Sequence, residues 1–193
     1  MIGRVGGEHT ACYQDRVERH IAAETSAKIA ANTLLAQVLV GCVQAHPWQV
    51  RVAMCMRNAL VRPWRLRQSS IGCPVSSLLE SEAGLRFAGI HPVRQIVRDD
   101  ARHAAVVLGA DDRHLVFRTS MEVERLVDGR MRISMTTSVQ TRNRLGRIYM
   151  CLVDPLHRRW IAPAILDAAL AHACAPDKVS DVCAIGIRRF AMK

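Results

Sequence analysis

Acidic, basic and hydroxyl-bearing residues gather in two separate stretches of the sequence that could together orient a ligand. One stretch is residues 112–114, and the other is residues 142–149. Arginine guanidinium groups bind carboxylates and phosphates through paired hydrogen bonds, which suits them to anionic or carbonyl-bearing ligands. We therefore expect a polar mouth made of Asp112, Arg113, His114, Arg142, Asn143, Arg147 and His157.

Two other interpretations of the same residues stay open. In one, Asn143 caps a helix and Asp112 pairs with a nearby arginine, so that the cluster fixes loops without doing chemistry. In the other, His114 or Tyr149 carries out acid–base catalysis with a pKa tuned by a neighbouring aspartate. Spacing alone pairs no nucleophile with a base, so no residue is assigned as catalytic, and these two are candidates only.

A β-hairpin that turns at residues 127–129 must position both stretches. Apolar and polar residues alternate on either side of this turn, which is the period of a strand with one buried face. A two-residue turn would place Phe117 opposite Gln140, whereas a three-residue turn places it opposite Val139. The apolar match favours the three-residue turn with Gly129 in the left-handed conformation, because a one-residue slip moves every side chain to the other face.

The preferred register also predicts which face of the hairpin is buried. Met121 then lies opposite Met135 on the apolar face. The polar face pairs Glu124 with Arg132 and Arg118 with Ser138. After Gly146 the apolar residues recur every three or four positions, which predicts a long helix. Its expected buried stripe is Ile148, Tyr149, Leu152, Leu156 and Trp160, with bends or interruptions at Pro155 and Pro163.

The rest of the chain predicts further strands and helices within a single domain. Residues 15–23, 93–98 and 103–109 are expected as strands, and residues 25–44 and 47–62 as helices. The expected core stripe of the first helix is Leu35, Leu39, Cys42 and Val43, and that of the second is Val52, Met56 and Leu60. We expect a flexible leader over 1–12, one domain over 13–175 and a tail over 176–193.

Composition and charge narrow the classes of function. Half of the residues are hydrophobic and 23% are charged, which is typical of a folded globular chain. The net charge is +10, and the chain has three lysines, which leaves 24 of the 27 basic residues as arginine. No dense basic run accompanies this charge, and the 4% aromatic content argues against a base-stacking platform for nucleic acid.

Cysteine and hydropathy patterns indicate a protein of the cytoplasm. The seven cysteines are odd in number and widely spaced, which argues against disulfides and a zinc site and favours a reducing compartment. No metal and no cofactor are therefore expected. The longest apolar stretch, residues 34–43, is too short to span a membrane.

Several short motifs resemble a known family. Residues 108–118, 141–149 and 155–158, with weaker matches at 47–63 and 91–93, are similar in order and spacing to the bacterial domain-of-unknown-function family 2867. That family is similar to the START-like (SRPBCC) helix-grip proteins. The resemblance implies an α+β helix-grip fold, in which a curved antiparallel sheet wraps on a long C-terminal helix and two short helices follow the first strand.

The resemblance also implies a function for the apolar face. We expect a small hydrophobic or amphipathic ligand to bind in an internal cavity without turnover. The residues expected to line it are Leu115, Phe117, Met121, Met135, Val139, Tyr149, Leu152 and Leu156. Two alternatives are a cyclase- or hydratase-like enzyme that uses the polar end of the same cavity, and a basic module that binds an acidic partner. The sequence leaves the ligand and the oligomeric state open.

Overall fold

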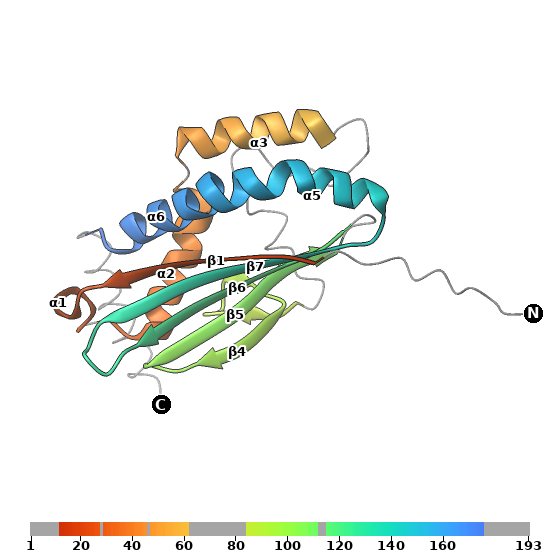
Figure 1. Ribbon diagram of the computed structural model, residues 1–193. Helices are drawn as coiled ribbons and strands as arrows, with labels where there is room; N and C mark the ends of the chain where they lie inside the picture. The colour runs from red at the N-terminus through yellow and green to blue at the C-terminus, as the bar shows by residue number, and fades with distance from the viewer. Residues whose placement is uncertain (1–11, 28, 46, 62–83, 112–114, 176–193) are drawn as a thin grey trace, which may run out of the picture.

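Five antiparallel strands form the sheet that organises the fold (Figure 1). The computed structural model describes residues 12–27, 29–45, 47–61, 84–111 and 115–175. The strands lie in the order β1-β7-β6-β5-β4. Their bounds are β1 (Cys12–Ile21), β4 (Gln95–Asp99), β5 (His103–Asp111), β6 (Leu115–Arg125) and β7 (Met131–Thr141), and a separate two-stranded sheet pairs β2 (Arg86–Phe87) with β3 (His91–Pro92).

The hairpin register predicted from the apolar match is confirmed. Phe117 pairs with Val139 and Met121 with Met135. The backbone N–H of Leu126 donates to the carbonyl of Arg130, which encloses the three-residue turn. Gly129 has a φ of +83°, a conformation that side chains with a Cβ rarely adopt.

The two faces of the sheet differ in polarity as the alternation predicts. The apolar face buries residues from β5, β6 and β7, including Val106, Met121 and Ile133. The opposite face carries charged cross-strand pairs, and both predicted pairs, Glu124 with Arg132 and Arg118 with Ser138, are in register there. One face of the sheet therefore packs against the hydrophobic core, and the opposite face is directed toward solvent.

Helices α1 (Ala23–Ser26) and α2 (Ala31–Gln44) divide the region predicted as one helix. The predicted stripe of Leu35, Leu39 and Cys42 is buried. Contacts between α2 and the last helix are extensive, and Gly41 permits them. A Cβ at Gly41 would lie 2.7 Å from both the Cα and the carbonyl oxygen of Ala169.

The last described elements form a helical segment of 30 residues that crosses the apolar side of the sheet (Figure 1). It consists of α5 (Arg144–Leu156), a π-helical turn η2 (His157–Ile161) and α6 (Ala162–Ala173). Pro155 lies just before η2, and Pro163 lies in the first turn of α6. Both prolines therefore mark changes in the helix, as predicted.

The predicted buried stripe of α5 was wrong by one position. Ile148, Leu152, Leu156 and Trp160 are exposed, and of the predicted stripe Tyr149 alone is buried. Met150 is buried beside Tyr149, and Val153 is partly buried against them. Apolar residues occur on two adjacent lines along this helix. The sequence therefore predicts that the segment is helical, but it does not show which of the two lines is buried. The packing of α5 against the sheet, including β7, selects the line that is buried.

Helix α3 (Trp48–Val61) also exposes the face predicted to be core. Val52 and Met56 are exposed, and Val50 is the buried residue. The reason is the position of α3, which lies beyond α5 on the side away from the strands (Figure 1). The side chain of Leu60, residues 1–11 of the expected leader (1–12) and the expected tail (176–193) lie outside the described residues, and Cys12 begins β1.

Among the described residues, no helix is both long enough and apolar enough to cross a membrane.

Candidate functional site

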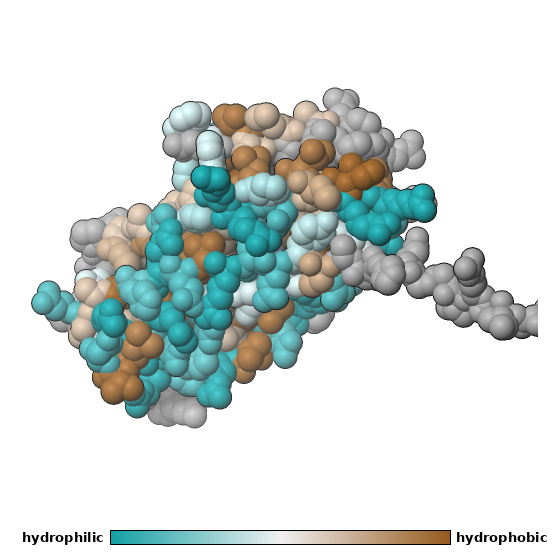
Figure 2. All heavy atoms as spheres, viewed as in Figure 1, coloured by the Kyte–Doolittle hydropathy of each residue, from teal (hydrophilic) through white to brown (hydrophobic). Residues whose placement is uncertain are grey.

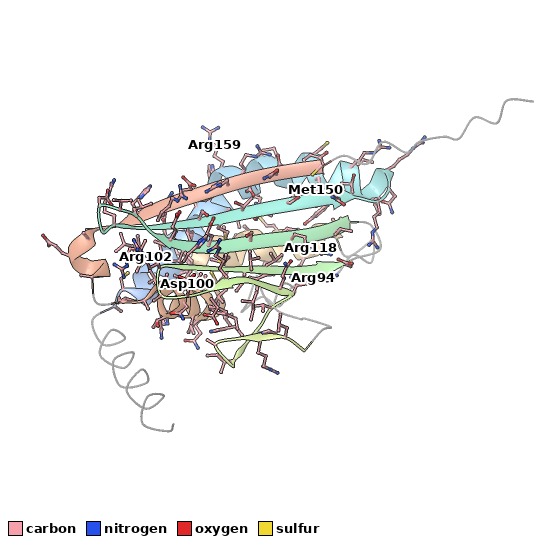
Figure 3. The ribbon with its side chains drawn as sticks, turned by 90° about the horizontal axis from the view of Figure 1, so that it is seen from below. Arg94, Asp100, Arg102, Arg118, Met150 and Arg159 are labelled. Atoms are coloured by element: carbon pink, nitrogen blue, oxygen red, sulfur yellow. The ribbon has the colours of Figure 1, made fainter. Side chains whose placement is uncertain are left out.

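One member of the predicted polar mouth, Arg142, takes part in an ion-pair network around Asp111 on the outer face of the sheet. Asp111 Oδ1 lies 2.6 Å from Arg118 Nη1, and its Oδ2 lies 3.6 Å from Arg94 and 3.8 Å from Arg142. Figure 3 shows Arg94 and Arg118 at this same end of the strands. The hydrogen bond from Arg118, with the charges of the other two arginines, lowers the pKa of Asp111. These groups fix the end of the sheet and already satisfy one another.

The remaining members of the predicted mouth are only partly described. Residues 112–114, which include His114, lie outside it. Asn143 is the N-cap of α5, and its Oδ1 accepts a hydrogen bond of 2.9 Å from the N–H of Gly146. This agrees with the turn-and-cap interpretation. Arg147 is half-buried on α5.

The apolar residues predicted to line a cavity divide into two clusters on the inner face. Met121 and Met135 belong to the main core beneath α2 and α6. Val139 and Tyr149 belong to a second cluster beneath α5. Leu115, Phe117, Tyr13 and Val153 are partly buried against that second cluster. Leu152 and Leu156 belong to neither.

A row of polar residues separates these two clusters. The strand register places Asp15 of β1 opposite Thr137 of β7, and Thr137 opposite Thr119 of β6. All three side chains are on the inner face and buried. The row above it contains Val139 and the row below it contains Met135, so the polar groups lie in an otherwise apolar surface.

Thr119 is the unusual member of this row. Its side chain is 3% exposed, and its hydroxyl has no hydrogen-bond partner in the structure. A buried hydroxyl without a partner costs about 1–3 kcal/mol, so most buried polar groups are paired. Among the described residues, His91 Nε2 and His172 Nε2 are also buried without a partner, and Thr119 is the one of the three that lies in the polar row.

Asp15 pairs with a histidine of the π turn above it. His157 Nδ1 lies 3.1 Å from Asp15 Oδ2, with the aspartate side chain 5% exposed and the histidine side chain 25% exposed. Burial alone would raise the pKa of Asp15. The hydrogen bond and charge of His157, a hydrogen bond from Thr137 and the charge of Arg158 outweigh burial and lower the pKa.

The π turn gives His157 its position. Pro155 has no N–H to donate to the helical ladder, and the helix changes to the wider π form two residues later. Such turns are rare and occur often at functional sites. Here the turn brings the histidine over β1, the edge strand of the sheet.

Tyr13 extends the polar groups along β1. It is two residues from Asp15 and therefore on the same face, and its hydroxyl lies 3.7 Å from Cys151 Sγ of α5. The hydrogen bond with the thiol, followed by burial, raises the pKa of Tyr13. The phenol therefore stays protonated at neutral pH and can donate a hydrogen bond.

This arrangement can bind or move a proton. A histidine oriented by a carboxylate through Nδ1 presents Nε2 as an acceptor or donor toward a ligand. The threonine hydroxyls beside it can orient a carbonyl or hydroxyl group. Within the described residues, no group of three His, Cys, Asp or Glu side chains is arranged to hold a metal ion.

Sequence reasoning named His157 as part of the polar mouth but did not name Asp15, Thr119 or Thr137 as site residues. One signal was available, because Asp15 alternates with Tyr13 and Val17 and so falls in the apolar phase of its strand. A carboxylate in that phase must find a partner inside the protein. The partner itself is 142 residues away, and no local pattern predicts it.

Comparison with known families assigns the chain to one of them. The family model described as "Protein of unknown function (DUF2867)" matches residues 9–164, and the chain belongs to this family. No curated protein matches the sequence.

Proposed function

We propose that this protein binds a small amphipathic ligand on the inner face of the sheet, beneath the long C-terminal helix. The single observation that carries the proposal is the buried and unpartnered hydroxyl of Thr119. In this proposal the helix and sheet act as a helix grip, with the ligand between them.

The two clusters give the ligand its expected character. Its apolar part would contact Phe117 and Val139, which lie one row above Thr119 on the same face. Its polar part would reach Thr119 and the neighbouring Thr137. A carbonyl or hydroxyl group suits this row, because each can accept the hydrogen bond that the threonine hydroxyl does not make within the protein.

A pair of variants at Thr119 tests the proposal. Thr119→Val keeps the shape and removes the hydroxyl, whereas Thr119→Ser keeps the hydroxyl. The expected result is that Thr119→Val is as stable as the wild type or more stable, because it removes an unsatisfied buried group. It should nevertheless bind the amphipathic fluorophore 1-anilinonaphthalene-8-sulfonate more weakly, while Thr119→Ser binds it like the wild type.

The readouts are the fluorescence titration and native mass spectrometry of protein purified from cells. A small molecule that co-purifies with the wild type should be depleted in Thr119→Val. Equal probe affinity in all three proteins, with no co-purified molecule in any of them, would overturn the proposal.

The Asp15–His157 pair favours a second candidate function. In this alternative the protein is a cyclase- or hydratase-like enzyme, and His157 is the general base that a buried carboxylate orients. The base takes a proton from carbon beside a carbonyl, and the same proton is available for a leaving hydroxyl, so that water is lost or gained.

Captured ligands distinguish the two functions. If His157 is a base, His157→Gln should retain the unreacted ligand, and its mass should differ from that of the wild-type ligand by one water. Identical ligands in both proteins would leave binding as the function and remove catalysis. Asp167→Asn, which changes an exposed carboxylate on α6, is the matched control.

A further inference from the structure

Two helices that lie on one side of the sheet expose apolar stripes (Figure 1). The stripe of α3 contains Trp48, Val52 and Met56. The stripe of α5 and η2 contains Ile148, Leu152, Leu156 and Trp160. Members of each stripe are four residues apart, and helical residues at that spacing lie on one face. We call these seven residues the apolar stripes.

The exposure of the apolar stripes is too large to be incidental. Trp48, Met56 and Trp160 are 70%, 68% and 67% exposed. Figure 2 shows hydrophobic residues gathered over α3 and α5, whereas the strands below present mostly hydrophilic ones. Contiguous apolar patches on a monomer usually mark an interaction site.

The charge around the apolar stripes is strongly positive. The sequences of α3, α5 and η2 contain six arginines and a single carboxylate, Asp154, which pairs with Arg158. Arg51, Arg144 and Arg159 are exposed, and Figure 3 shows Arg159 projecting past the edge of β1, away from the strands. The partner of this surface should therefore be apolar and negatively charged.

An anionic bilayer surface has both properties. Helices that lie in the membrane interface combine an apolar face with basic residues, and tryptophan is enriched at that depth. Each apolar stripe contains one tryptophan. A helix that lies on the surface needs no membrane-spanning length.

We propose that the apolar stripes of α3 and α5–η2, with their flanking arginines, bind the surface of anionic phospholipid bilayers. The apolar side chains would enter the boundary between headgroups and acyl chains, while the arginines contact lipid phosphates. The apolar stripes are exposed, whereas Thr119 is buried on the inner face of the sheet, so the two proposals stand or fall separately.

Vesicle co-sedimentation tests the proposal with the full chain. Phosphatidylcholine vesicles and vesicles that also contain phosphatidylglycerol are the two probes. The wild type should bind the anionic vesicles, bind the neutral ones much more weakly, and dissociate as salt rises. Its tryptophan emission should shift to shorter wavelength on binding.

Substitutions assign the binding to this surface. Leu152→Gln should weaken the affinity for anionic vesicles roughly ten-fold, because it removes apolar area that would be buried in the bilayer on binding. Arg159→Gln should weaken it roughly five-fold. Val127→Gln and Arg98→Gln are the matched controls, since both residues are exposed and far from the apolar stripes in the fold, and both should bind like the wild type.

Three outcomes would overturn the proposal. One is equal binding to both kinds of vesicle, and another is unchanged binding by Leu152→Gln and Arg159→Gln. The third is a concentration-dependent dimer without lipid that Leu152→Gln dissociates, which would assign the surface to a second copy of the chain. Circular dichroism of each variant verifies that it is folded. Leu152→Gln should keep the wild-type spectrum because Leu152 is exposed.

Discussion

His157 Nδ1 lies 3.1 Å from Asp15 Oδ2, and this contact joins the π turn of the last helix to the first strand across 142 residues of chain. It ties the helix to the edge of the sheet. The buried position of the carboxylate makes the contact sensitive to pH.

Asp15 should make the protein less stable in acid. Its pKa in the folded protein is below the ordinary value of about 3.9, so the stability it contributes is present above that value. That contribution is lost as the pH falls through the lowered folded-state pKa. Asp15→Asn should lower the free energy of unfolding at pH 7 by about 1–3 kcal/mol and flatten its acid dependence.

Urea denaturation between neutral pH and about pH 2 measures this effect, a range that brackets the ordinary carboxyl pKa. Asp167→Asn is the control, because its carboxylate forms an exposed pair with Arg19 and should contribute less than about 1 kcal/mol. An unchanged pH profile in Asp15→Asn would show that the pair is energetically neutral.

Asn143 should act on stability through its cap and not through a ligand. Asn143→Ala removes the oxygen that accepts from Gly146 and should cost about 1 kcal/mol. Asn143→Ser and Asn143→Asp keep a capping oxygen and should cost less. Thermal denaturation gives the ranking, and an Asn143→Ala protein of normal stability that fails to bind the fluorophore would contradict it.

Gly41 should not tolerate a methyl group. In an open helix, alanine in place of glycine stabilises by up to about 1 kcal/mol. Here the added Cβ would meet the backbone of Ala169 at 2.7 Å, so Gly41→Ala should instead destabilise by about 1–3 kcal/mol. Because the contact is with backbone atoms, adding Ala169→Gly should not restore stability, whereas recovery would mean that the side chain is responsible.

Gly129 should prefer residues that accept a positive φ. At a φ of +83°, Gly129→Ala should cost about 1 kcal/mol, and Gly129→Asn should cost less, since asparagine adopts the left-handed region more readily. Chemical denaturation of the two variants provides the comparison. Equal losses would mean that the turn relaxes to a different geometry.

The sequence predicts the hairpin well because two independent signals agree there. The alternation of Phe117, Met121 and their partners selects a face, and Gly129 selects the turn. A register error would have exposed the whole apolar set, which is a large energetic difference. Because the two registers differ so much in energy, the sequence pattern is enough to select the correct one.

The helices were less predictable because their patterns carry weaker constraints. The line through Leu152 and Leu156 and the line through Tyr149 and Val153 are adjacent on α5, and both contain apolar residues. Choosing between them requires knowledge of what packs on each side. The polar row of Asp15, Thr137 and Thr119 was missed for a related reason, since each residue comes from a different strand and only the sheet brings the three together.

The π turn also sets the rotation of the helix that follows it. In an uninterrupted α-helix, the residues that α6 buries, such as Leu166 and Ala169, would point almost opposite to those that α5 buries, such as Tyr149. One additional residue in a turn rotates everything after it by about 100°. Deleting Arg159 would therefore turn Ala169 away from Gly41, so the length of this one turn determines whether both halves of the helix can dock at once.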